Sequence, residues 1–125
     1  MAAGTLVSSG SSGNMPTGSG SERLCRASIF TLNNDTQEIL SGTAGHIYTI
    51  ISIIFNDQQG AAGTIGIRVN TGTNNIKLLE ASPHVADATF VWSDKFVLEE
   101  DDDLDVFNSV TDGHWYITYI DQDWS

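Results

Sequence analysis

The densest group of side chains that could do chemistry is an acidic run at residues 99–103, which Asp105 follows closely. Carboxylates at this density could bind a calcium ion or form a pair of catalytic acids. A calcium loop also needs a glycine at its tight turn and a distal bidentate glutamate, and catalytic carboxylates converge from separate elements. The run has none of these features. We therefore interpret it as a solvated turn between strands, with weak calcium binding by Glu99–Asp103 left open.

The other reactive side chains form no recognisable motif. His46, His84 and His114 lie 38 and 30 residues apart, without the closely spaced ligand pairs that are typical of zinc sites. Cys25 is the only cysteine, so an internal disulfide is impossible, and a small buried thiol is commoner in an alternating strand than a nucleophile. The glycine-rich segment 60–66 leads into a β-branched strand rather than a helix that could bind phosphate. We expect neither an enzyme nor a cofactor nor a metal.

The length and the charge of the chain limit the classes of molecule that it could bind. The 125 residues can form one domain with one core, and 16 acidic against five basic residues give a net charge of −11. A nucleic acid or an anionic membrane would require a basic surface that this composition cannot supply. No run approaches the ~20 apolar residues of a membrane helix. A lone cysteine suits a reducing cytosol, and the expected partners are other proteins.

The chain divides into an arm at residues 1–21 and a domain at residues 22–125. The arm is rich in glycine and serine and carries no charged residue, so it cannot form a core alone. A disordered tail, a flexible linker or a vector-derived sequence would share this composition. Small apolar side chains favour an arm that lies on a neighbouring subunit; they are Leu6, Val7, Met15 and Pro16.

From residue 22 onward the hydrophobic period is two, and Asn, Asp and Gly clusters interrupt it every 8–12 residues. This pattern predicts an all-β fold, an antiparallel β-sandwich of jelly-roll-like form with about eight short strands. The predicted strands are 24–32, 37–41, 46–55, 63–70, 75–80, 88–98, 104–110 and 114–121.

Strand 46–55 is apolar on both faces, which predicts burial on both. Strict alternation puts Ile47, Ile51, Ile53 and Phe55 on one face. It puts Tyr48, Ile50 and Ile54 on the other, which we expect to meet another chain, although the arm or a loop of the same chain could cover it. Near the C-terminus, Trp124 is expected at the surface as an anchor for a neighbour.

Aromatic side chains could instead stack on sugars in a carbohydrate-binding module. Phe90 and Trp92 are two residues apart, and Trp115, Ile117 and Tyr119 alternate in the same way. Same-face alternation of this kind is typical of a sandwich core. The carbohydrate-binding hypothesis therefore ranks below a structural role.

Residues 45–121 resemble the small β-sandwich virion proteins of tailed bacteriophages. The similarity lies in the order of "IYTIISIIFND", a glycine-rich loop, "TIGIRVN", "IKLLE", "KFVLEEDDDLDVFNS" and "WYITYID". These proteins commonly join two late strands by Leu-Glu-x-Gly-Asp-x-Leu-x-Val, whose place residues 98–106 take, with Asp101 at the glycine position.

The resemblance implies a solvent-facing hairpin connection at residues 99–103 and a capsid cement (decoration) protein. Such a protein would be made in the host cytoplasm and bind the major capsid protein on the outer surface of the virion. It would often form a homotrimer and extend its arm across neighbouring subunits. A neck, tail or fibre-adaptor protein is the alternative with the same fold.

Overall fold

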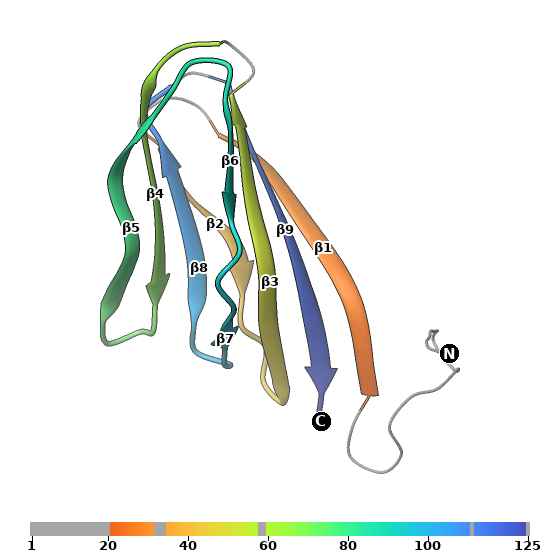
Figure 1. The fold of residues 1–125 in the computed structure, drawn as a ribbon. Helices are drawn as coiled ribbons and strands as arrows, with labels where there is room; N and C mark the ends of the chain where they lie inside the picture. Colours follow the sequence, from red (N-terminus) through yellow and green to blue (C-terminus); the bar gives the residue numbers. More distant parts are fainter. Residues whose placement is uncertain (1–20, 32–34, 58–59, 111, 125) are drawn as a thin grey trace.

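The protein is built from antiparallel strands in two stacked sheets (Figure 1). The computed structural model describes residues 21–31, 35–57, 60–110 and 112–124. Its strands are β1 (Ser21–Thr31), β2 (Asp35–Ser41), β3 (His46–Asp57), β4 (Gly63–Asn70), β5 (Asn75–His84), β6 (Thr89–Trp92), β7 (Phe96–Leu98), β8 (Asp103–Asn108) and β9 (Gly113–Asp123). The predicted all-β sandwich is confirmed. Within the described ranges, no helix is long and apolar enough to cross a membrane.

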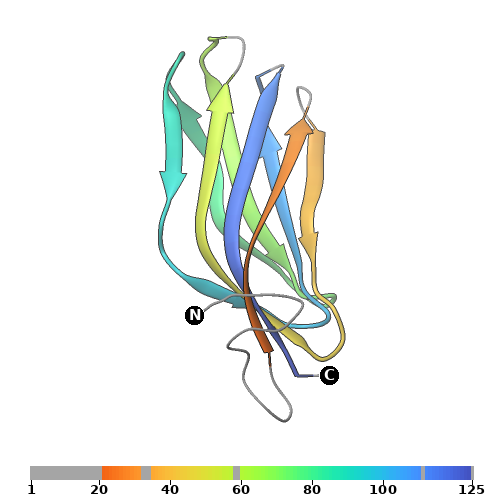
Figure 2. The same cartoon turned by 90° about the vertical axis from the view of Figure 1, so that its right-hand side faces the viewer.

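The strands form nested antiparallel pairs, in which early strands of the chain pair with late ones. β4 pairs with β5 at the tip of this hairpin, β3 with β6 and β7, β2 with β8, and β1 with β9. Successive pairs alternate between the sheets: sheet A has the order β1-β9-β3-β6, with β7 also on β3, and sheet B has the order β2-β8-β4-β5. This nested pairing is the jelly-roll arrangement. Figure 2 views the molecule from the side of sheet A, whose strands lie in front.

The core fills the space between the sheets. Sheet A contributes large side chains that include Ile50, Ile53, Phe55, Trp115 and Ile117, and sheet B contributes Ile65, Ile67, Val69, Leu104 and Val106. The alternation predicted for strand 63–70 and for residues 115–119 is confirmed, and Phe90 and Trp92 also pack against this core. Burial of each large apolar side chain contributes about 1.5–3 kcal/mol.

The two faces predicted for strand 46–55 are wrong, because β3 contains a β-bulge. The register against β9 shifts between Ile50 and Ser52, so Ile51 is an extra residue. A bulge interrupts strict alternation, so residues on its two sides can share a face although they differ in parity. Tyr48 and Ile50 consequently face the core together with the residues beyond the bulge, while Ile54 lies on the outer face of sheet A.

The last predicted strands also differ in detail. The predicted strand 88–98 is divided into β6 and β7, because the polar residues 93–95 interrupt its pairing with β3. The acidic run follows β7 of sheet A and leads into β8 of sheet B. The expected hairpin connection is therefore wrong: the turn crosses from one sheet to the other. Residues 1–20, with Leu6, Val7, Met15 and Pro16, lie outside the described residues.

Candidate protein-interaction surface

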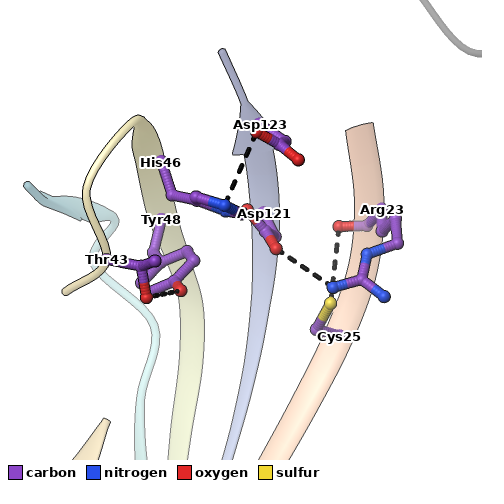
Figure 3. Close-up of polar contacts among 7 residues, drawn as sticks. All are labelled: Arg23, Cys25, Thr43, His46, Tyr48, Asp121 and Asp123. Atoms are coloured by element: carbon purple, nitrogen blue, oxygen red, sulfur yellow. Dashed lines mark hydrogen bonds and ion pairs between the residues drawn. The ribbon is translucent and has the colours of Figure 1, made fainter. Parts of the chain in front are cut away.

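A polar cluster lies at the end of the sandwich where β1 begins, β9 ends and β3 begins (Figure 3). Asp121 is 4% exposed, and its carboxylate lies between two cations or potential cations. Its Oδ1 is 2.7 Å from His46 Nδ1, and its Oδ2 accepts a hydrogen bond of 3.1 Å from Arg23. The other ring nitrogen of His46, Nε2, is 3.5 Å from Asp123 Oδ1. The cluster therefore joins three neighbouring strands of sheet A.

The His46–Asp121 pair resembles the base and the orienting acid of a catalytic triad, but among the residues that the structure describes a nucleophile does not complete it. A nucleophile would have to contact Nε2 of His46, and that atom faces Asp123. Cys25 stands on β1, across β9 from His46 (Figure 3). Burial raises the pKa of the Cys25 thiol, whereas an activated cysteine has a lowered pKa. Burial likewise raises the pKa of Tyr119, opposite Cys25 on β9, to about 12. We interpret the cluster as a structural clasp.

The other predicted reactive groups are dispersed over the fold. His84 is buried against the ring of Phe55, with ring centroids 4.9 Å apart, and His114 meets Phe30 at the same distance. Across residues 21–31, 35–57, 60–110 and 112–124, no three His, Cys, Asp or Glu side chains are grouped so that they could hold a metal ion.

The acidic turn uses its carboxylates for local structure. The Glu99 backbone N–H donates to the Asp102 carboxylate at 2.9 Å, and the Asp102 N–H donates to the Glu99 carbonyl at 3.0 Å. The next acid, Asp103, accepts a hydrogen bond of 2.7 Å from Ser41 on β2. Gly42 approaches this turn so closely that a Cβ there would collide with the Glu99 carbonyl oxygen. The carboxylates of Asp102 and Asp103 thus bind different partners within the chain.

The outer face of sheet A carries many exposed apolar side chains. Residues paired across antiparallel strands share a face, and two cross-strand rows here are largely apolar. One row crosses all of sheet A as Leu24, Ile120, Thr49 and Val97, and the second as Ser28, Tyr116, Ile54 and Val91. We call the apolar members of these rows the apolar face: Leu24, Ile54, Val91, Val97, Tyr116 and Ile120.

These side chains are accessible although they lie on a paired sheet. Leu24 is 73% exposed and Val91 is 57% exposed. Of the charged residues in the strands of sheet A, alternation puts only Glu22 and Arg26 on the outer face. Arg26 itself lies over the Tyr116 ring, 6.0 Å from its centroid. The polar row of Arg26, Thr118 and Ser52 lies between the two apolar rows. Exposed apolar side chains grouped on one sheet face are typical of protein-interaction sites.

The outer face of sheet B has the opposite chemistry. One row crosses all four strands as Glu38, Asp105, Arg68 and Lys77. Partial burial, and then repulsion from the carboxylates of Asp103 and Asp105, raises the pKa of Glu38. Burial also raises the pKa of Asp105, against the opposing effect of Arg68, 3.7 Å away. A hollow of about 240 Å³ beside this row is lined by charges of both signs and by Phe107.

The structure separates the residues that were predicted to bind partners. Tyr48 and Ile50 belong to the core of their own chain, so the prediction that they contact another chain is wrong. Ile54 belongs to the apolar face. Trp124 is 50% exposed, as predicted, and lies beside a hollow of about 340 Å³ with His46 and Glu100 at its edge. The remaining members of the apolar face were missed, because only the strand pairing brings them together.

Comparisons with known proteins give a structural likeness but no family. No protein-family model matches the chain, and no curated protein matches it. Among solved structures, the chain is similar to one described in the words "Bacillus endospore appendages form a novel family of disulfide-linked pili". The TM-score is 0.49 at 14% sequence identity, and the alignment covers 88% of this chain and 95% of that chain.

Proposed function

We propose that the protein is a structural component of a tailed-phage particle, a capsid cement protein that binds other protein subunits through the apolar face. The observation that carries this proposal is the contrast between that face and the net charge of −11. A strongly acidic chain that keeps one sheet face almost free of charge has a surface suited to a protein partner.

The arrangement of the strands supports a rigid scaffold for such a surface. The apolar face lies on strands whose inner side chains are fully buried, including Ile53, Trp115 and Ile117. Because these strands are fixed by the core, the outer rows are held in place before a partner binds. A preorganised surface loses little conformational entropy on association, which favours binding.

Stabilisation of the particle then follows from mass action. A protein that binds only the assembled shell, in many copies, lowers the free energy of that state relative to free subunits. The charged row lies on the opposite sheet from the contact and, together with the acidic turn at residues 99–103, keeps the bound protein soluble. In this proposal the partners are the major capsid protein and further copies of the chain, as a homotrimer on the outer surface of the head.

The test compares phage heads assembled with the protein and without it, by thermal disruption and by infectivity. We expect heads that carry the protein to withstand a higher temperature, with the difference growing with the amount bound. If heads without the protein are equally stable but lose tails, the cement function is wrong and a neck or tail role replaces it. If neither stability nor infectivity changes, the protein is no structural component of the particle.

A further inference from the structure

The hollow beside the charged row of sheet B, called here the sheet B hollow, exists because one residue in the sheet has no side chain. Gly66 of β4 pairs with Phe107 of β8, and Phe107 pairs with Thr36 of β2, so the three form one outward row. A Cβ at position 66 would lie 3.2 Å from the Leu79 carbonyl oxygen and 3.9 Å from Phe107 Cβ. Glycine inside a strand often marks such a close approach. Gly66 therefore leaves a floor of bare backbone between the Phe107 side chain and β5.

A β-bulge in β5 shapes the opposite side of the sheet B hollow. The register of β4 against β5 shifts across Gly66, so two residues of β5, Glu80 and Ala81, stand opposite this one glycine. Ala81 has a φ of 47°, in the left-handed region that residues other than glycine rarely adopt. Bulges and backbone outliers of this kind cluster at binding sites, where they re-aim neighbouring groups. Both features here belong to the lining of the hollow.

The polar lining contains the two signs of charge in equal number. Lys77 Nζ lies 2.5 Å from Glu80 Oε1, and Arg68 Nε lies 3.7 Å from Asp105 Oδ2. The second distance is too long for a hydrogen bond, and within the described residues the buried Arg68 Nε has no hydrogen-bond partner. A buried N–H donor without an acceptor costs free energy, which a bound acceptor would recover. The hollow thus offers a donor that lacks an acceptor, in surroundings that carry no net charge.

These features define the class of ligand. Balanced charges disfavour an ionic ligand and favour hydroxyl groups, which accept from a guanidinium and donate to a carboxylate. The ring of Phe107 and the side chain of Ala81 add apolar area for C–H groups. The volume of about 240 Å³ is below the ~300 Å³ at which sites for drug-sized ligands begin, so it suits a single ring. A pyranose sugar combines hydroxyl groups at its edge with an apolar C–H face.

We infer that the sheet B hollow is a binding site for one neutral pyranose unit of a glycan. Phe107 packs against the C–H face of the sugar, Arg68 Nε donates to a sugar oxygen, and the Glu80 carboxylate accepts from a hydroxyl. The aromatic residues of the core take no part. Because sheet B lies on the opposite side of the sandwich from the proposed subunit contact, the site stays open on an assembled particle (Figure 1). The inference does not rest on the cement function.

The experiment titrates isotopically labelled full-length protein with the methyl α-pyranosides of glucose, galactose, mannose and N-acetylglucosamine, followed by amide NMR spectra. We expect at least one glycoside to shift the amide resonances of Gly66, Ala81 and Phe107 until they saturate. A ligand of this size makes few contacts, so the expected Kd is on the order of 1 mM.

Two conservative variants test the assigned contacts. Arg68→Lys keeps the positive charge and removes the Nε donor, and Phe107→Leu keeps an apolar side chain and removes the ring. We expect each to weaken binding at least about tenfold, since each loses one specific contact. The matched controls make the same changes on the outer face of sheet A, as Arg26→Lys and Phe30→Leu, and should bind as the unchanged chain does. The amide spectra also show whether each variant is folded.

Three results would overturn the inference. The absence of saturable shifts with every glycoside up to about 100 mM, roughly a hundred times the expected Kd, means that the hollow binds no pyranose. Shifts confined to sheet A, or equal weakening by the control variants, place the binding elsewhere. If inorganic phosphate or glycine shifts the same amides at lower concentration than any glycoside, the ligand is charged. These outcomes leave the stability of phage heads unaffected, and failure of the cement function would leave the sugar titration unaffected.

Discussion

The two outer faces of the sandwich are built by the same kind of strand pairing and have opposite chemistry. On sheet B a row of acids and bases crosses four strands, from Glu38 to Lys77. On sheet A the corresponding rows consist mainly of apolar side chains such as Leu24 and Val91. Both faces belong to sheets of paired antiparallel strands, so strand pairing alone does not require the difference.

A functional constraint explains the difference better than a folding constraint. An exposed apolar sheet face increases the risk of aggregation, and charged side chains are the usual protection against it. The protein carries that protection on sheet B and at the turn of residues 99–103, but not on the outer rows of sheet A. The outer face of sheet A, where Glu22 and Arg26 are the charged residues of the strands, is therefore the one that we expect to be covered by protein in the assembled state.

The largest expected effect on stability comes from Asn108, a residue of sheet B that forms hydrogen bonds to sheet A. Asn108 of β8 accepts hydrogen bonds from Trp115 Nε1 at 3.0 Å and from the Thr31 hydroxyl, and it donates to the Val110 carbonyl at 2.8 Å. Asn108→Ala leaves the buried indole N–H without a partner, and we expect a loss of about 3 kcal/mol in the free energy of unfolding. Urea denaturation measures it. A loss below about 1 kcal/mol would mean that the network does not link the sheets.

A charge placed on each face separates their roles. Val91→Asp introduces a carboxylate into the apolar face, and Thr36→Asp introduces the same group into sheet B. Both positions are exposed, so we expect changes in unfolding free energy below about 0.5 kcal/mol in each variant. We expect Val91→Asp to weaken binding to phage heads at least about tenfold, because a desolvated charge is costly, while Thr36→Asp has little effect. Quantitative cosedimentation measures both; equal weakening would remove the distinction between the faces.

Glu38, in the charged row of sheet B, should give the stability of the protein a pH dependence of defined sign. The pKa of Glu38 is raised in the folded protein, so its carboxylate opposes folding most strongly above that pKa and less as the pH falls. Glu38→Gln should therefore raise the melting temperature at pH 7 and lose this advantage near pH 4. Calorimetry at the two pH values measures the difference. A melting temperature that falls at pH 7 would show that this carboxylate stabilises the sheet.

The smallest expected effect concerns the inner side of sheet A. Burial raises the pKa of Cys25, so its thiolate should be scarcer at pH 8 than that of a cysteine in an unstructured peptide. We expect slower alkylation by iodoacetamide in the folded protein and the ordinary rate in urea. Mass spectrometry over time follows the reaction. A folded-state rate above that of the peptide would identify an activated thiol and reopen the question of catalysis.

Most of the fold could be predicted from the sequence, because alternation and turn residues act locally. Strand 63–70 was predicted with its exact bounds, and its Ile65, Ile67 and Val69 are buried as expected. The bulge at Ile51 could not be predicted, because the run "TIISIIF" is apolar at both parities and gives no sign of where alternation breaks. The prediction that Tyr48 and Ile50 face away from the core was wrong for that reason.

The candidate surface could be predicted only in part. Leu24, Val91 and Tyr116 come from three strands that are distant in sequence and form one face only through the strand pairing. Each is unremarkable alone, since single exposed apolar residues are common. The clasp of Arg23, His46 and Asp121 was missed for the same reason, as it joins residues 98 positions apart. Pairing is a property of topology, which local patterns do not contain.

The central claim is that sheet A, and not sheet B, contacts other subunits. Hydroxyl-radical footprinting of the protein bound to phage heads and of the free protein tests this directly. We predict that binding protects Leu24 and Tyr116 on the apolar face while the reactivity of Phe107, at the hollow on sheet B, stays unchanged. Protection of Phe107 with unchanged reactivity of Leu24 and Tyr116 would contradict the account and assign the contact to the charged face.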